Sequence, residues 1–156
     1  MIIAIDIETA GLDARKFVVA CLMKENGKTK VFYKKEDLWN YIIDLGMKEK
    51  KRKKVLTIYS HNAQYDFYGY ANVKDRNLKW YSHRPFIVSY MNGDKEIIKF
   101  LDTLSIYKMP LQKIGEIIGL KKMEMPMELK RIKKMKKYLK KLLHSVIIKK
   151  INLRRN

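Results

Sequence analysis

The sequence predicts an α/β domain whose mixed sheet has about five strands flanked by helices, with a long basic helix at its C-terminal end. Short apolar runs bounded by turn residues recur through residues 1–102, which is typical of buried strands. Two Asn-Gly pairs, Asn26-Gly27 and Asn92-Gly93, indicate tight hairpins. Segments with apolar residues at helical spacing separate some of the strands, which favours a mixed sheet over a purely parallel one.

The first half of the chain predicts three antiparallel strands followed by a helix. Residues 2–8 form an apolar run that ends in acids, and residues 17–24 and 29–34 flank the Asn26-Gly27 turn. Glu36 and Asp37 open a helix that we expect to end at Gly46, because glycine favours the C-terminal cap. The charged run 48–54 is then expected to be a solvated loop.

The second half predicts three more strands and three more helices. Residues 55–59 are a fourth strand, a polar turn follows, and residues 63–71 are a short helix. Residues 86–91 and 96–102 flank the second hairpin, and Pro110 starts a helix that ends at Gly119. From Glu128 to about Ile151 apolar residues recur at helical spacing between lysines, so we expect one long basic amphipathic helix. We therefore divide the chain into a domain over residues 1–127 and a basic helix within residues 128–156, packed on it or extending from it.

Net charge indicates the class of partner. The 156 residues contain 35 lysines and arginines against 16 acids, a formal charge of +19, and residues 103–156 carry only three of the acids. Such a field attracts polyanions, so nucleic acid is the first partner to consider. A lysine-rich surface with no partner would give the same composition.

The chain has no apolar stretch long enough for a membrane span and no secretory-signal pattern, so we expect a cytoplasmic protein without membrane contact. The one cysteine, Cys21, lies in an apolar run and is expected to be buried.

Two acidic elements carry the candidate chemistry. Asp6 and Glu8 are two residues apart on a strand, so their side chains share a face where both carboxylates can hold one divalent cation. The second element runs from Ser60 to Phe67 and places Asn62 and Asp66 at the start of a helix. A purely structural interpretation makes Asn62 the helix N-cap and Asp66 a favourable first-turn acid.

Together these elements resemble a known family. Asp6-Ile7-Glu8-Thr9, followed by His61-Asn62-x-x-Tyr65-Asp66, resembles the first two exonuclease motifs of the DEDD superfamily, most like the proofreading domain of family B DNA polymerases. The stretch 101–111 resembles the segment between the second and third motifs, as in the protein-primed branch. The resemblance covers residues 1–127 and implies a ribonuclease-H-like fold without a polymerase domain.

The resemblance implies 3′–5′ hydrolysis of single-stranded DNA with two Mg²⁺ or Mn²⁺ ions. It assigns Asp6, Glu8 and Asp66 as catalytic metal ligands. The contacts to the terminal nucleotides that it implies come from Thr9, Asn62, Tyr65, Thr103 and Leu104. The sequence does not separate DNA from RNA as the substrate.

The third motif of the family, Tyr-x-x-x-Asp, is incomplete. Tyr138 is followed four residues later by Leu142, and no acid follows Glu128. Asp102, at a strand end, is a further candidate for the missing ligand. Two other functions therefore stay open: a non-catalytic module that binds single-stranded nucleic acid, and an exonuclease remnant or subunit of a split polymerase whose basic helix docks on a replication partner.

Overall fold

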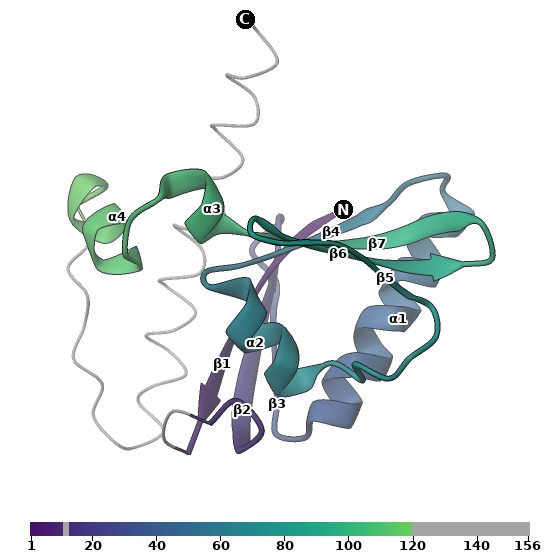
Figure 1. Ribbon diagram of the computed structural model, residues 1–156, viewed down its shortest axis with the longest axis horizontal. Coiled ribbons are helices and arrows are strands. Elements are labelled where there is room, and N and C mark those ends of the chain that lie inside the picture. Colours follow the sequence, from purple (N-terminus) through teal and green to yellow (C-terminus); the bar gives the residue numbers. More distant parts are fainter. Residues whose placement is uncertain (11–12, 120–156) are drawn as a thin grey trace, which may run out of the picture.

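The computed structural model describes residues 1–10 and 13–119, shown in colour in Figure 1. The predicted basic helix from Glu128, together with Tyr138 and Leu142, lies outside the described residues. The division at residue 127 also lies outside them and stays a prediction. No helix in the described part of the chain is both long enough and apolar enough to cross a membrane.

A seven-stranded sheet in the order β3-β2-β1-β4-β7-β6-β5 forms the centre of the molecule. Strands β1, β4 and β7 run parallel, and every other neighbouring pair is antiparallel. This mixed α/β architecture confirms the predicted fold class and is consistent with a ribonuclease-H-like fold. The strands are β1 (Ile2–Thr9), β2 (Phe17–Lys24), β3 (Thr29–Phe32), β4 (Leu56–Ser60), β5 (Leu78–His83), β6 (Phe86–Asn92) and β7 (Lys95–Asp102).

Both predicted hairpins are present. Strands β2 and β3 pair antiparallel around Gly27, whose φ is +80°, and β6 and β7 pair around Gly93, whose φ is +61°. Both glycines adopt the left-handed backbone conformation that residues with a Cβ rarely take. The local turn chemistry therefore set these two registers, as the sequence indicated.

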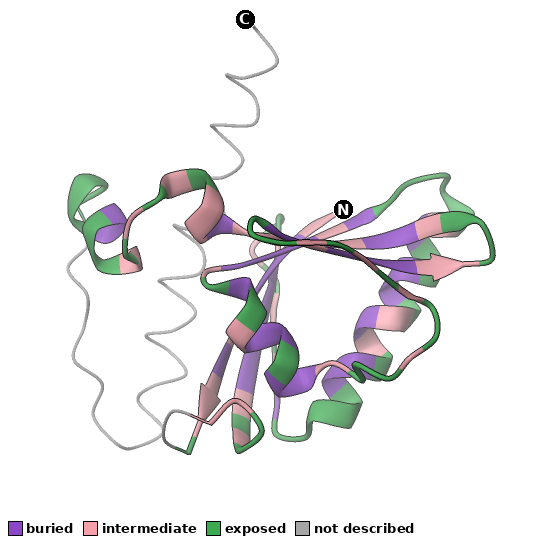
Figure 2. Ribbon diagram, in the orientation of Figure 1, coloured by how far each residue is buried: buried purple, intermediate pink, exposed green. Residues whose placement is uncertain are grey.

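Helices α1 (Lys35–Lys51) and α2 (Ala63–Tyr70) cover one face of the sheet (Figure 1). Their sheet-facing sides are buried, as Figure 2 shows, and with Ile3, Ile5 and Phe100 they form the main core. Burial of such apolar area is the principal force that fixes both helices on the sheet. Two short helices, α3 (Thr103–Tyr107) and α4 (Leu111–Ile117), continue from the end of β7. Cys21 is fully buried, as predicted.

The predicted end of the first helix was wrong. Helix α1 continues past Gly46 to Lys51, so residues 48–51 of the expected loop 48–54 are helical. A Cβ at Gly46 would lie 2.5 Å from Cγ1 of Ile98, which shows that the glycine lets the helix approach the sheet rather than end. Close backbone approach, and not capping, is the reason for a glycine here.

Strand β5 was missed: the sequence predicted six strand ranges within a sheet expected to have about five strands, and β5 is the seventh strand of the sheet. Its alternation is visible in the exposure pattern, in which Lys79 and Tyr81 are exposed while Leu78 and Trp80 are partly buried. Every second residue of β5 is exposed, so its polar residues weakened the apolar signal that marks the other strands.

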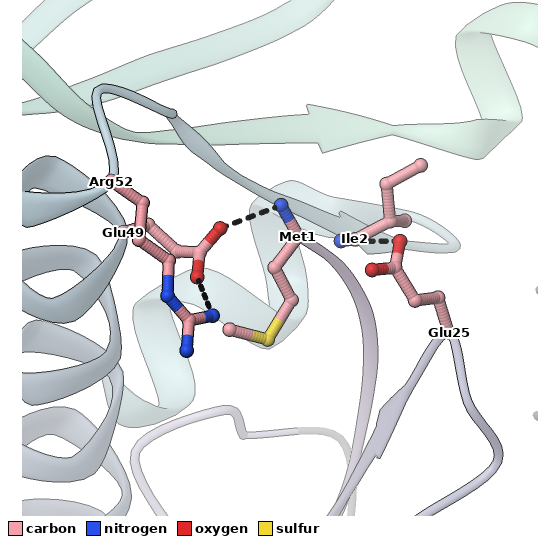
Figure 3. A network of polar contacts seen from close by, with 5 residues as sticks. All are labelled: Met1, Ile2, Glu25, Glu49 and Arg52. Carbon is pink, nitrogen blue, oxygen red and sulfur yellow. Dashed lines mark hydrogen bonds and ion pairs between the residues drawn. The ribbon is translucent and has the colours of Figure 1, made fainter.

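A polar network fastens the first residues to α1 (Figure 3). The ammonium group of Met1 lies 3.0 Å from Oε2 of Glu49, whose other oxygen accepts from Arg52 at 3.0 Å. The Ile2 amide donates to Glu25 at 3.1 Å. Burial tends to raise the pKa of Glu49, but the ammonium group and Arg52 outweigh it and lower that pKa. These contacts hold the start of β1 beside α1 and so fix the strand that carries the acids.

Candidate metal and nucleic-acid site

The candidate site lies where three parallel strands end. Strand β4 is parallel to both β1 and β7, and its last residue, Ser60, pairs with Asp102 at the end of β7. The carboxyl ends of these strands therefore lie at the same end of the sheet, which is where open α/β sheets place ligands. Helices α2 and α3 begin at this same end of the sheet, since they follow β4 and β7 directly.

Asp6 and Glu8 occupy alternate positions on β1, opposite Cys21 and Val19 of β2. Because side chains alternate along a strand, both carboxylates lie on the same side of it, as predicted. Burial raises the pKa of Asp6 to about 7, the charge of Glu8 adds to the rise, and a hydrogen bond with the Ile7 backbone opposes it. Two carboxylates so placed resist simultaneous ionisation in the absence of a counter-charge.

Asp66 comes from the first turn of α2 and is buried, with 5% of its surface exposed. Burial raises its pKa well above the usual value, and the charge of Asp6 adds to this rise. The Ser60 hydroxyl hydrogen-bonds the Asp66 carboxylate and lowers the pKa, whereas the charges of Asp102 and Glu8 raise it. Asp66 and the β1 acids are therefore close enough for their charges to interact.

The acids form a negatively charged cluster, but their side chains are not arranged as a complete set of metal ligands. Across residues 1–10 and 13–119, no three carboxylate, histidine or cysteine side chains are arranged as a ready set of metal ligands. The donor set nevertheless fits Mg²⁺ or Mn²⁺, which prefer carboxylate oxygens. In the described part of the chain neither Asp6 nor Asp66 has a lysine or arginine ion-pair partner.

Asn62 immediately precedes α2 in an unusual conformation. Its φ is +62° and its ψ is +50°, which few residues other than glycine adopt, and its side chain is exposed and makes no capping hydrogen bond. The cap comes instead from Asp102, whose Oδ1 accepts from the amides of Ala63 at 3.2 Å and Leu104 at 2.9 Å. The structural interpretation of Asn62 as a side-chain N-cap was wrong, and Asp102 has a structural role that needs no metal.

Tyr65 joins the two acidic elements. Its hydroxyl lies 2.6 Å from Oγ1 of Thr9, so the end of β1 is tied to the first turn of α2. The ring is partly buried and packs against the main core. Both residues, predicted to contact nucleotides, therefore lie together beside the acids.

Thr103 is fully buried, which removes it from a direct contact with nucleic acid. Its hydroxyl donates to the Ser60 carbonyl at 3.2 Å and lies 3.1 Å from Nδ1 of His61. Burial lowers the pKa of His61, and the charge of Asp102 opposes that shift. Thr103 thus positions the turn after β4, whereas Leu104 is partly exposed at the start of α3.

Two residues of the site were missed in the sequence. Ser60 hydrogen-bonds Asp66, and its place at the last position of a strand that leads into the site is the signal that was available. Tyr70 lies one helical turn after Asp66, is buried, and has its pKa raised well above the usual value by burial and by the Asp66 charge. Its spacing of four residues from Asp66 on a helix is the signal that was available, and its ring also belongs to the main core.

Comparison with known proteins gives a match in structure alone. No protein-family model and no curated protein sequence matches the chain. Solved structures of Phi29 DNA polymerase do match. The complex with primer-template DNA and incoming nucleotides aligns with TM-score 0.71 and 10% identity, the binary complex with primer-template DNA with 0.68 and 10%, and the complex with single-stranded DNA with 0.64 and 12%. Each alignment covers 97% of this chain but 31% of the polymerase, so the likeness is to about a third of that protein and shows a shared fold.

Proposed function

We propose that the chain is a metal-dependent 3′–5′ exonuclease that acts on single-stranded DNA ends. The observation that carries the proposal is the placement of Asp6, Glu8 and Asp66 at the carboxyl ends of the parallel strands, where the charge of Glu8 raises the pKa of Asp6 and the charges of both raise the pKa of Asp66. Clusters of mutually perturbed acids are typical of functional sites. The chain shares its fold with part of a polymerase whose structure was solved with single-stranded DNA, and this also supports a function on DNA.

The three acids are the proposed metal ligands. In the roles implied by the motif resemblance, Asp6 would contribute to the sites of both ions, Glu8 to the first and Asp66 to the second. Bound there, Mg²⁺ or Mn²⁺ would activate water for attack on the phosphodiester and stabilise the charge that develops on the leaving 3′ oxygen. Ser60 would keep the Asp66 carboxylate oriented, because its hydroxyl already hydrogen-bonds that group.

The strand end would lie against the residues between β1 and α2. The exposed side chain of Asn62 is held in a strained backbone conformation, which is common where a residue binds a ligand. Tyr65, fixed by its hydrogen bond to Thr9, offers a ring for a base, and Leu104 offers an apolar edge at the start of α3.

A second function is favoured by a specific observation. The sequence has no acid after Glu128, and among the described residues no set of three ligands is already assembled. A chain that keeps the fold and charge while lacking the third-motif acid suits a non-catalytic single-strand binder. It also suits an exonuclease remnant or subunit of a split polymerase, which would need a replication partner.

The test of the proposal is degradation of 3′-labelled and 5′-labelled single-stranded DNA in Mg²⁺ or Mn²⁺. We expect slow shortening from the 3′ end by the wild type and none by Asp6→Ala. Asp44→Ala, which removes an exposed acid on α1, is the matched control and should keep the activity. Binding without any shortening by the wild type would favour the non-catalytic function.

A gain-of-function variant tests the missing ligand. Leu142→Asp restores an acid at the position that the third motif implies, so it should raise the rate of 3′ shortening. The reason is that carboxylates offset the repulsion between two divalent ions. A fast wild type that Leu142→Asp does not improve would mean that another residue supplies the fourth ligand.

A further inference from the structure

Three aromatic rings form a stacked column beside α2, and nothing in the proposed function uses it. The ring of Trp80 on β5 stacks on Tyr68 of α2, with centroids 6.0 Å apart and planes 24° from parallel. On β5, His83 stacks on the same indole at 5.3 Å and 25°. Edge contacts from Phe67 at 5.6 Å and Phe86 at 6.1 Å fix the central ring. We name Tyr68, Trp80 and His83 the ring column.

An irregularity in the edge strand produces the column. Residues 80 and 83 would point to opposite faces of a regular strand, because their separation is odd. The register between β5 and β6 shifts between Trp80 and Ser82, so one extra residue, Tyr81, restores both rings to one side. Both outer rings of the column belong to exposed residues, Tyr68 being 41% exposed.

The column continues the proposed binding site. Tyr68 follows Tyr65 by three residues on α2, and side chains so spaced are neighbours on a helix surface. Tyr68 of the ring column is therefore the helix-surface neighbour of Tyr65, which lies next to Asp66 on α2.

The charge around the column suits a polyanion. Lys74, Arg76, Lys79 and Arg84 are exposed in the segment around β5, where Asp75 is the only acid. Flat rings among cations fit a single strand, because bases stack on aromatic side chains while lysine and arginine balance the phosphates.

We propose that the ring column is a second base-binding site, which holds nucleotides of the single strand on the 5′ side of the end bound at the acids. This inference rests on the proposed function for the place of the 3′ end. Stacking needs only the π-face of a base, so the column binds without sequence preference. Its role is to increase the affinity for strands long enough to reach from Tyr65 to His83.

Binding of oligo(dT) in EDTA, which prevents hydrolysis, tests the inference. Strands of about 4 and about 12 nucleotides are compared, since single-strand sites span lengths of this order. Tyr68→Ala and His83→Ala should each weaken binding of the long strand about fivefold or more and leave the short strand unchanged. Tyr65→Ala should weaken both. Tyr33→Ala is the matched control, because Tyr33 is 64% exposed and directly follows β3, at the opposite edge of the sheet.

A strand whose 5′ nucleotides lack bases separates stacking from charge. The wild type should bind it less tightly than the complete strand, and Tyr68→Ala should cause no further loss. Tryptophan fluorescence gives an independent measurement, because Trp39 is buried in the core and Trp80 is in the column. Quenching by the complete long strand, absent with the abasic one, is expected.

The inference is overturned if Tyr68→Ala and His83→Ala behave like Tyr33→Ala on the long strand while melting as the wild type does. It is also overturned if their losses persist on the abasic strand. A protein that binds through the column but never shortens DNA would refute the proposed hydrolysis and leave the second site standing. A protein that shortens DNA without any length-dependent loss in these variants would refute the second site alone.

Discussion

At the scale of single residues, the acids of the site make the metal-free protein less stable than it would be without them. Asp6 and Asp66 are held in a partly desolvated cluster that raises their pKa values. An acid whose pKa is higher in the folded state binds its proton more tightly there than in the unfolded chain. Its contribution to stability is therefore complete below about pH 4 and is lost as the pH rises through the folded pKa, which is about 7 for Asp6.

Asp6→Asn should consequently stabilise the metal-free protein at pH 8. The amide cannot ionise, so the free energy of unfolding should rise by an amount on the order of a few kcal/mol, with little change at pH 4. Urea denaturation in EDTA at both pH values measures this. In Mg²⁺ or Mn²⁺ the wild type should have the higher free energy of unfolding, since the ions stabilise only the wild type. Equal stability of the two proteins at pH 8 without metal would contradict the desolvation of Asp6.

Glu49 is predicted to show the opposite pH dependence. Its pKa is lowered in the folded protein, so its contribution is present above about pH 4.5 and is lost as the pH falls through the folded value. Glu49→Gln removes the negative charge and one of the two oxygens that accept from the Met1 ammonium group and Arg52, and should cost about 1–3 kcal/mol at pH 7. Glu36→Gln, at an exposed position of the same helix, is the control and should change little. Thermal unfolding at pH 7 and pH 3 should show the difference only at the higher pH.

At the scale of elements, the approach of α1 to the sheet depends on one glycine. Alanine normally stabilises a helix interior relative to glycine by roughly 1 kcal/mol. At Gly46, however, the new Cβ would lie 2.5 Å from Cγ1 and 2.8 Å from Cδ1 of Ile98.

Gly46→Ala is therefore expected to destabilise the protein by about 1–3 kcal/mol, because the helix must move outward or Ile98 must change rotamer. Chemical denaturation measures the loss, and Gly46→Ala combined with Ile98→Val should recover part of it. A stabilised Gly46→Ala protein would show that α1 lies farther from the sheet than this structure places it.

At the scale of the whole molecule, the formal charge of +19 governs association with any polyanion. If several lysines and arginines neutralise phosphates, single-stranded DNA binding should weaken steeply with salt, with a slope of about −0.7 per contact in a plot of log K against log salt. Fluorescence anisotropy with labelled oligonucleotides at about 50 and 200 mM salt gives that slope. An affinity independent of salt would mean that the charge is only surface composition.

Local sequence signals were enough for most of the fold. The Asn26-Gly27 and Asn92-Gly93 turns, the apolar run from Ile2 and the helical spacing after Ala63 each depend on neighbours a few residues away, and each is present as predicted. The side-by-side placement of Asp6 and Glu8 also followed from the sequence, because it is a property of any strand.

Tertiary structure decided what those residues do. Thr103 became a buried support, Asp102 became the cap of two helices, and Gly46 became a contact with the sheet instead of a helix end. The same is true of the proximity of Asp66 to Asp6, which joins positions sixty residues apart. Burial, close approach and mutual charge depend on which distant segments pack together, whereas turn and strand preferences are properties of the local chain. The sequence therefore determined where most of the elements begin and which acids are present, and the packing of α1 and α2 on the sheet determined how those acids are surrounded.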